Sequence, residues 1–311
     1  MESISGTKKL IVVAGPTASG KSDLAVAIGL RIGKKKVEII SADSRQVYKG
    51  MDIGTGKVMK REMRGIPHSM LNVASPKRIF TAADYQKLAR REIKRTWKEN
   101  KIPIVCGGTG LYIRAAVDGI VLPEVKPNPA LRKRLEKTPV GKLFALLKKK
   151  DPERAKTIDP KNSRRLIRAI EVAETLGHVP PLSFSPLEAD ILFIGVKKEK
   201  EELKKLIETR LKKRLQQGML REFERLHEKG ISWKRMEDLG LEYRYGARLL
   251  EGKITRKEFE EALAKEIAAY AKRQMTWFKK DPRIVWISDK KEAIRLADGF
   301  IKNERLFSLS S

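Results

Sequence analysis

One segment near the N-terminus limits the folds open to this chain more than any other. Residues Gly15 to Ser22 read GPTASGKS, which fits the pattern GxxxxGK[ST] in full. A continuous apolar run rich in β-branched residues, Leu10 to Ala14, comes directly before it, and apolar residues at helical spacing begin at Leu24. A strand, a glycine-rich loop and a helix in this order are typical of phosphate binding, so the sequence predicts an α/β fold.

The loop itself predicts a site for a di- or triphosphate. Its glycines let backbone N–H groups turn toward a phosphate, and the N-terminus of the following helix adds partial positive charge. The Lys21 ammonium can reach terminal oxygens, and the Ser22 hydroxyl can ligate Mg²⁺. The expected diphosphate-binding residues are Gly15, Pro16, Thr17, Ala18, Ser19, Gly20, Lys21 and Ser22. The loop alone does not identify what carries the phosphates.

Three further apolar runs repeat the strand pattern, at Val37 to Ile40, Ile102 to Cys106 and Ile191 to Val196. The first leads into SADSRQ and the second into GGTG, so both strands end at polar or glycine-rich motifs. Strands that alternate with helices form parallel sheets, which bind ligands at the carboxyl ends of their strands. We expect a P-loop NTPase-like parallel sheet flanked by helices, with the site at that edge.

The stretch between the last two of these runs has a different composition. Residues 124–189 read as several short helices with proline breaks and no strand, which predicts a small all-helical domain inserted into a core made of residues 1–123 and 190–311. From Glu124 to Lys150 there are nine Lys and Arg against two Asp and Glu, a net charge of +7. Two long helices, Leu203 to Leu215 and Phe259 to Lys280, and a short strand, Ile284 to Ile287, are expected after the insertion.

The charge of the whole chain points to an anionic partner. It has 68 Lys and Arg against 39 Asp and Glu, a net charge of +29, while 41% hydrophobic residues is too high for a disordered polycation. Nucleic acid and an acidic membrane surface both fit such an excess, and so does a lysine-rich surface that serves solubility.

Cysteine and histidine usage narrows the class further. The lone Cys106 excludes a disulfide framework and a zinc finger built on several cysteines, and His68, His178 and His227 are too dispersed to suggest a metal site. The apolar run that stops at Gly15 is too short for a membrane span or a signal segment. We expect a cytoplasmic protein without a membrane partner.

Four motifs in order resemble one family. GPTASGKS, SADSRQVYKGMDIGTGK, GGTGLYIRA and KRQMTWF, spread from about Lys9 to Trp286, are together similar to the tRNA dimethylallyltransferases, also called tRNA isopentenyltransferases. The resemblance implies a P-loop fold that binds dimethylallyl diphosphate instead of ATP. It implies transfer of the prenyl group to N6 of the adenine on the 3′ side of the anticodon, with release of diphosphate. The run IPIVC ends without a carboxylate, which agrees with chemistry that moves no phosphoryl group.

The resemblance also assigns catalytic roles. Asp43 matches the general base, and Thr109 matches a threonine whose hydroxyl lies near the bridging oxygen or the nucleophile. Alternatively, Thr109 only caps the next helix. Lys21 and an Mg²⁺ on Ser22 would stabilise the leaving diphosphate. Arg244 matches an arginine that helps to hold the diphosphate, although the neighbouring position, a glycine in the family, is Glu242 here.

A second set of positions is implied to contact the anticodon stem-loop of tRNA. The adenine must be extruded from its stack, and an amide such as that of Gln46 can pair with its edge. The implied tRNA-binding residues are Asp43, Ser44, Arg45, Gln46, Arg132, Arg164, Arg165, Leu166, Ile167 and Arg168. A solvated basic face would also explain the arginines. Arg273 and Gln274 are expected as neighbours of the site, with no catalytic step assigned.

Three other functions compete with this interpretation. A nucleoside or nucleotide kinase shares the loop and the sheet but consumes ATP. A prenyltransferase that acts on free adenine nucleotide needs no broad basic surface. An RNA-binding module with a vestigial loop would not need Lys21, Ser22, Asp43 and Thr109 all intact. For the chain itself, we expect a monomer.

Overall fold

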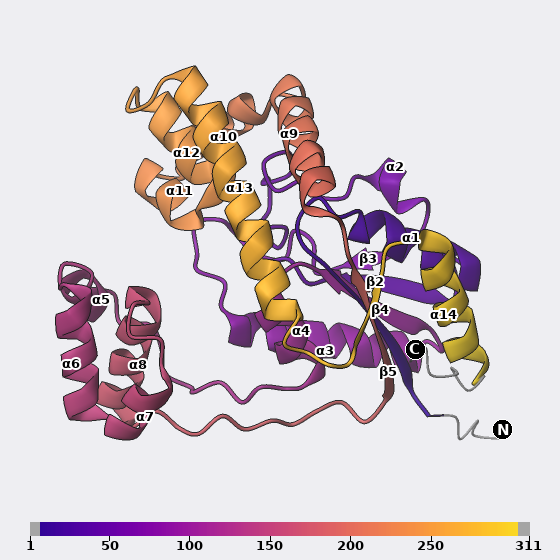
Figure 1. The fold of residues 1–311 in the computed structure, drawn as a ribbon, viewed down its shortest axis with the longest axis horizontal. Helices are drawn as coiled ribbons and strands as arrows, with labels where there is room; N and C mark the ends of the chain where they lie inside the picture. The colour runs from indigo at the N-terminus through magenta and orange to yellow at the C-terminus, as the bar shows by residue number, and fades with distance from the viewer. Residues whose placement is uncertain (1–6, 304–311) are drawn as a thin grey trace. The chain divides into compact units, whose positions relative to one another are not determined.

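The computed structural model describes residues 7–303 (Figure 1). Its sheet contains the strands β1 Lys9–Ala14, β2 Val37–Ser41, β3 His68–Ser69, β4 Ile102–Gly107, β5 Asp190–Val196 and β6 Ile284–Ile287. All the pairings are parallel, and the strand order is β3-β2-β4-β1-β5-β6. The predicted parallel α/β sheet is therefore confirmed, with the strand before the phosphate loop at its centre.

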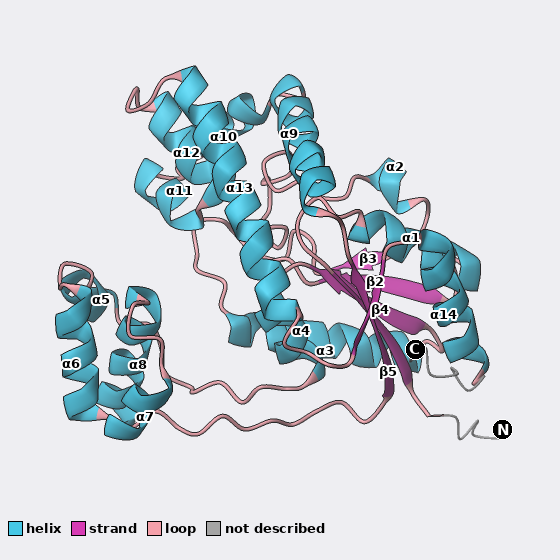
Figure 2. Ribbon diagram, viewed as in Figure 1, coloured by secondary structure: helices cyan, strands magenta, loops and turns pink. Residues whose placement is uncertain are grey.

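Helices lie between the strands in chain order, and α14 follows the last strand (Figure 2). The helices are α1 Lys21–Ile32, α2 Lys60–Met63, α3 Ala82–Lys98, α4 Gly110–Val117, α5 Pro129–Leu135, α6 Val140–Lys150, α7 Pro152–Thr157, α8 Ser163–Leu176, α9 Lys200–Gln216, α10 Met219–Glu228, α11 Trp233–Leu239, α12 Leu241–Leu250, α13 Arg256–Phe278 and α14 Lys290–Lys302. The two long helices expected after the insertion correspond to α9 and α13.

The residues of β1 alternate between two hydrophobic cores, one on each face of the sheet. Ile11 and Val13 pack with residues of α1 and α14, whereas Leu10 and Val12 pack with residues of α3, α4 and α13. Val12 pairs with Val105 of β4 on one side and with Phe193 of β5 on the other, so the strand is covered in every direction. This burial on both faces explains why the strand is apolar from Leu10 to Ala14.

Three neighbouring strands end at the motifs that the sequence singled out. In the order β2, β4, β1, their last residues are Ser41, Gly107 and Ala14. Because parallel strands end at the same edge, the SADSRQ segment, the GGTG segment and the phosphate loop meet there. The backbone joins two of them directly, since Thr109 donates its N–H to the Ala42 carbonyl at 3.1 Å.

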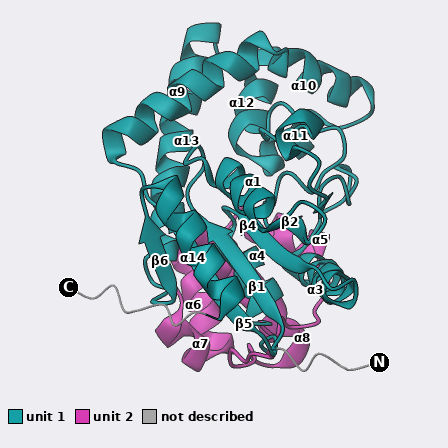
Figure 3. Ribbon diagram, turned by 90° about the vertical axis from the view of Figure 1, so that its right-hand side faces the viewer, with its two compact units in different colours: residues 1–119, 186–311 teal, residues 120–185 magenta. Residues whose placement is uncertain are grey.

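The chain divides into two compact units (Figure 3). Unit 1 comprises residues 1–119 and 186–311, and unit 2 comprises residues 120–185, so the unit begins and ends four residues earlier than the predicted insertion at 124–189. Unit 2 contains α5 to α8 around its own core, in which Leu143, Leu147, Leu166 and Ile170 are fully buried. Within unit 2, Ile120 and Phe184 form an antiparallel bridge between the entering and returning chain.

Candidate active site

The phosphate loop forms a tight turn between β1 and α1. Ala18 (φ 64°) and Gly20 (φ 86°) both adopt the left-handed conformation. For alanine this conformation costs about 1 kcal/mol, a cost that persists only where the surroundings hold the backbone. The Ser19 side chain is buried, and its Oγ is one of the few buried polar atoms in residues 7–303 without a hydrogen-bond partner. The loop therefore holds a strained backbone and an unused hydroxyl.

Lys21, the first residue of α1, lies among charges of both signs. Its Nζ donates to the Pro16 carbonyl at 3.2 Å. Removal from water lowers the pKa of its ammonium; Cys106 and Asp43 raise this pKa, while Arg210 and Arg214 lower it further. A site that crowds three cations together stabilises an anion that enters it, as a diphosphate would.

The arginines of α9 are functional candidates that sequence reasoning missed. Burial lowers the pKa of Arg210, and the neighbouring Arg214 lowers it further. Arg214 is buried and donates from Nη1 to the Gly54 carbonyl at 3.2 Å and to Glu242 at 2.8 Å. The sequence presents these two arginines as part of the basic side of an amphipathic helix. Their spacing of four residues places them on one face, but only the packing shows which face is buried.

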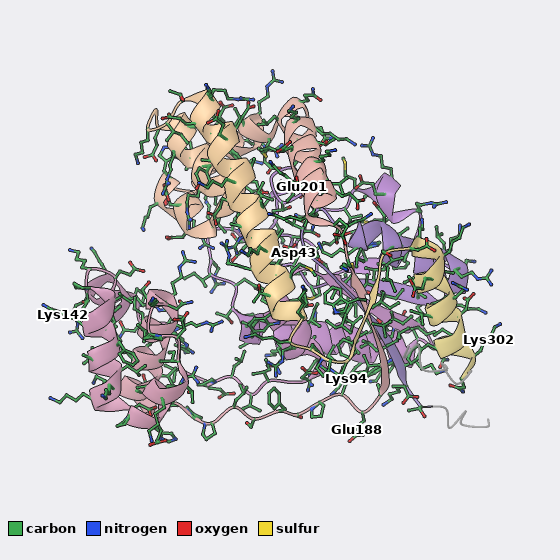
Figure 4. The ribbon with its side chains drawn as sticks, viewed as in Figure 1. Asp43, Lys94, Lys142, Glu188, Glu201 and Lys302 are labelled. Carbon is green, nitrogen blue, oxygen red and sulfur yellow. The ribbon has the colours of Figure 1, made fainter. Side chains whose placement is uncertain are left out.

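Asp43 is held in place by its own backbone neighbours. Its Oδ1 accepts the N–H of Arg45 at 2.8 Å and that of Gln46 at 3.2 Å, so the carboxylate closes the turn that follows β2. Asp43, labelled in Figure 4, raises the pKa of Tyr270 on α13, so these two side chains lie near each other. The carboxylate is half-buried at the strand edge, where it can accept a proton from a bound nucleophile.

Thr109 connects this turn to the loop after β4. Its Oγ1 accepts the Ser44 N–H at 3.0 Å. Thr109 is the N-cap residue of α4, but its side chain makes no capping hydrogen bond there. The alternative interpretation of this threonine as a helix cap is therefore wrong, and its hydroxyl faces the segment that carries Asp43.

The side chain of Gln46 contacts the loop formed by residues 51–57. Its Nε2 donates to the Gly56 carbonyl at 3.3 Å. The carboxylate of Glu222 holds the same loop, because it accepts three consecutive backbone N–H groups, those of residues 52, 53 and 54, at 2.7–3.0 Å. The hydroxyl of Tyr243 also donates to Glu222 at 2.8 Å. Sequence reasoning missed Glu222, which has no motif of its own.

Arg244 lies close to Arg45, whereas the cations that act on Lys21 are Arg210 and Arg214. Its Nε donates to the Glu237 carbonyl at 3.3 Å. A Cβ on Gly240 would be 3.6 Å from Arg244 Nη2 and 3.9 Å from Arg45 Nη2, so both guanidinium groups lie close to this glycine. Glu242, at the position where the family has glycine, is buried; burial raises the pKa of its carboxyl, whereas Arg214 opposes that rise.

Helix α13 explains part of the KRQMTWF motif. Gln274 is buried, and its amide contacts both the phosphate loop and the loop after β4. Arg273 is exposed and pairs with Glu266 at 2.9 Å. Burial raises the pKa of Tyr270 to about 12, and a hydrogen bond with Thr109 acts in the opposite direction.

The candidate tRNA-binding residues of unit 2 divide into two groups. Arg164 and Arg165 are exposed in the first turn of α8, whereas the side chains of Leu166 and Ile167 lie in the core of the unit. The predicted RNA contacts of these two apolar residues therefore do not come from exposed side chains. Their burial follows from the amphipathic pattern of α8, which directs them to the core.

Two other predicted contacts are engaged inside unit 2. Arg132 makes a bidentate pair with Glu171, at 2.9 and 2.6 Å, and Arg168 reaches the same carboxylate at 2.5 Å. Glu171 is only 1% exposed, while the two arginine side chains remain 30% and 37% exposed. Both arginines thus stabilise unit 2 through Glu171 and remain partly exposed to solvent.

Neither a metal cluster nor a membrane helix is found in residues 7–303. They contain no group of three or more His, Cys, Asp or Glu that could hold a metal ion. The same part of the chain has no helix long and apolar enough to cross a membrane. Ser22, on the exposed first turn of α1, is the residue that could offer a hydroxyl oxygen to a metal bound with phosphate.

Comparisons with known proteins agree with this geometry. A family model described as IPP transferase matches residues 46–281. The tRNA dimethylallyltransferase of Carboxydothermus hydrogenoformans is 39% identical over 301 residues, which cover 93% of this chain and 94% of the relative. The tRNA dimethylallyltransferase 1 of Syntrophus aciditrophicus is 39% identical over 298 residues, covering 93% and 96% of the two chains.

Solved structures extend the likeness to the fold. The tRNA isopentenylpyrophosphate transferase of Bacillus halodurans has a TM-score of 0.71 at 31% identity, over 96% of this chain and 97% of that one. A eukaryotic dimethylallyltransferase acting on tRNA has a TM-score of 0.78 at 26% identity, over 97% of this chain and 82% of that one. The chain therefore belongs to the IPP transferase family, together with the tRNA dimethylallyltransferases.

Proposed function

We propose that this protein transfers the dimethylallyl group of dimethylallyl diphosphate to N6 of the adenine 3′-adjacent to the anticodon in certain tRNAs. The observation that supports this most is the placement of Asp43 and Thr109 after adjacent strands, with Asp43 acting on the pKa of Lys21. A general base and an anion site are then close enough to serve the two ends of one substitution reaction.

The residues supply what this substitution needs. The N6 nitrogen attacks C1 of the allyl group; the N6–C1 bond forms, the C1–O bond breaks and diphosphate leaves. The amine is a weak nucleophile because its lone pair is delocalised into the ring, so Asp43 accepts the proton that N6 loses. The hydroxyl of Thr109 accepts the N–H of Ser44, the residue that follows Asp43.

Diphosphate binding combines the loop and helix α9. The free backbone N–H groups of the phosphate loop, the Lys21 ammonium and the guanidinium groups of Arg210 and Arg214 offer donors and positive charge to the leaving group. Mg²⁺ fits this donor set, because it commonly takes its oxygen ligands from substrate phosphates and water with few protein groups. Ser22 would hold it, and the ion would add positive charge opposite the departing oxygens.

The tRNA would be bound by two kinds of residue. Ser44, Arg45 and Gln46 lie beside Asp43, where the Gln46 amide can pair with the edge of an extruded adenine. The exposed Arg164 and Arg165, and lysines such as Lys142 on α6 (Figure 4), carry the positive charge that an RNA backbone requires. We propose that the protein acts as a monomer in the cytoplasm.

A transfer assay tests the proposal. The protein is incubated with Mg²⁺, labelled dimethylallyl diphosphate and either bulk tRNA or AMP, and label is followed in each acceptor. Label is expected in tRNA, on the adenine next to the anticodon. Label that enters AMP alone would favour the free-nucleotide prenyltransferase, and ATP consumption without any label transfer would favour the kinase. Either result contradicts the proposal.

A further inference from the structure

Gln274 connects two loops of the site through a single amide. It lies on α13, and its side chain is 6% exposed. Its Oε1 accepts the Thr17 N–H at 2.8 Å, and its Nε2 donates to the Gly108 carbonyl at 2.7 Å. Thr17 belongs to the phosphate loop, and Gly108 directly precedes Thr109. Both polar atoms of the amide are therefore used, one on each loop.

The packing around this amide leaves little room for movement. A Cβ at position 108 would lie 2.3 Å from Gln274 Nε2, so glycine there allows the amide to reach the backbone. One turn away on the same face of α13, Trp277 packs on the next loop glycine, since a Cβ on Gly110 would lie 2.0 Å from its indole nitrogen. Tyr270, one turn in the other direction, is close enough to Thr109 for that residue to lower the pKa of the phenol. Three successive positions of one helix face thus contact these loops.

The chemistry of the amide explains why glutamine suits this position. Thr17 offers a donor and Gly108 offers an acceptor, and a primary amide is the neutral side chain that presents both partners in one plane. A carboxylate would lose the donor, and an apolar chain would lose both bonds. The Thr17 N–H is occupied by Gln274 and the Ser19 N–H donates to the Pro16 carbonyl at 3.3 Å, so neither of these two donors is free for a phosphate in this arrangement.

We propose that Gln274 is a positioning residue of the transfer reaction, which sets the separation between the phosphate loop and Thr109. This inference rests on the proposed function, because the two loops would hold the leaving group and the residue beside the general base. Gln274 touches neither substrate, and its contribution is geometric. A displacement of about 1 Å at a reacting centre can lower the rate by about a hundredfold.

Two substitutions distinguish the contributions of the two hydrogen bonds of the Gln274 amide. Gln274→Glu keeps an acceptor for the Thr17 N–H but removes the donor to the Gly108 carbonyl. We expect kcat to fall by about tenfold while KM for dimethylallyl diphosphate stays within about threefold of wild type. Gln274→Met keeps the length and removes both bonds. For this variant we expect a larger fall in kcat, of about a hundredfold, together with a rise in KM for dimethylallyl diphosphate.

Thr276→Ala is the matched control, because Thr276 is exposed on the same helix and its hydroxyl donates only within α13, to the Lys272 carbonyl. Its kinetic constants should equal those of wild type. The inference is overturned if both Gln274 variants keep wild-type kcat and KM, or if both change these constants alike, as a loss of folded protein would. Wild-type enzyme that fails to label tRNA would instead refute the proposed function, so the two failures are distinguishable.

Discussion

At the scale of single residues, the two carboxylate oxygens of Asp43 differ in their hydrogen bonds. The Oδ1 atom of Asp43 accepts two backbone N–H groups, so in the proposed reaction Oδ2 is the oxygen that takes the proton. Thr109 fixes the same turn from the other side through the Ser44 N–H. Hydrogen bonds of this kind hold a base in one orientation before the substrate arrives, which reduces the entropy lost in the reaction.

Asp43→Asn tests the base without removing the turn, because the amide oxygen still accepts the two N–H groups. We expect kcat for transfer to fall by about 10²- to 10⁴-fold, while the Kd for tRNA stays within about threefold of wild type. Single-turnover kinetics and filter binding measure the two quantities. Asp289→Asn is the control, since Asp289 makes a similar turn with the Lys291 N–H at 3.2 Å. A near-wild-type rate for Asp43→Asn would exclude the general-base role.

Single residues could be located from the sequence where neighbours along the chain determine the local geometry. The turn of Asp43 and the phosphate loop are defined by neighbours in the chain, so their residues can be located from the sequence. The positions of Arg210, Arg214 and Glu222 depend on how α9 and α10 pack against the loops, about 160 residues away in the chain. Nothing in an amphipathic pattern distinguishes a buried arginine from a solvated one.

At the scale of elements, the buried strands were the most predictable part. Their apolar runs place β1, β2, β4, β5 and β6 within one residue of their bounds. The two-residue strand β3 has no such run, so only its pairing with β2 reveals it. Helix α3 was not singled out, although Thr81 and Asp84 form a capping box before its apolar positions. That signal was present in the sequence.

Unit 2 depends on one buried carboxylate. Burial raises the pKa of Glu171, but hydrogen bonds from Arg132, the Asn128 N–H and Arg168 outweigh that effect, and the pKa lies below its ordinary value of 4.5. A lowered pKa stabilises the folded unit above pH 4.5, and this contribution disappears as the pH falls through the folded value.

Glu171→Gln should lower the free energy of unfolding of unit 2 by about 2 kcal/mol at pH 7, because two arginines lose their shared anion. The difference from wild type should shrink below pH 4.5. Native-state hydrogen exchange of peptides from residues 120–185 measures both effects within the full chain. Glu153→Gln provides the control, since Glu153 is 80% exposed in its pair with Lys156. Equal exchange in wild type and Glu171→Gln at pH 7 would contradict the argument.

At the scale of the whole molecule, the net charge of +29 combines contributions with different uses. Some arginines are paired with carboxylates of the fold: Arg95 contacts Glu38, Glu92 and Glu99, and Arg214 contacts Glu242. Others, such as those of the first turn of α8, remain exposed. Net charge therefore predicts an anionic partner, and only the structure identifies which cations are available to it.

The salt dependence of tRNA affinity tests whether exposed cations act locally or through the total charge. Wild-type affinity should fall at least about tenfold between 50 and 200 mM salt. Replacing Arg164 and Arg165 by Gln should lower the slope of log K against log salt by about 1 to 2. Lys290→Gln with Lys291→Gln removes the same charge from an equally exposed first helical turn, that of α14, and should leave the slope unchanged. Equal slopes for the two double variants would show that only total charge matters.

The antiparallel bridge at the base of unit 2 has a consequence for how such enzymes diversify. Ile120 pairs with Phe184, and the Val121 N–H donates to the Ser183 carbonyl at 2.9 Å, so the chain leaves and returns at one point. On the side of unit 1, the Leu187 N–H donates to the Val117 carbonyl at 3.0 Å, which joins the two ends again. A short turn could close that gap. Evolution can therefore lengthen, shorten or exchange the inserted domain without altering the register of the sheet.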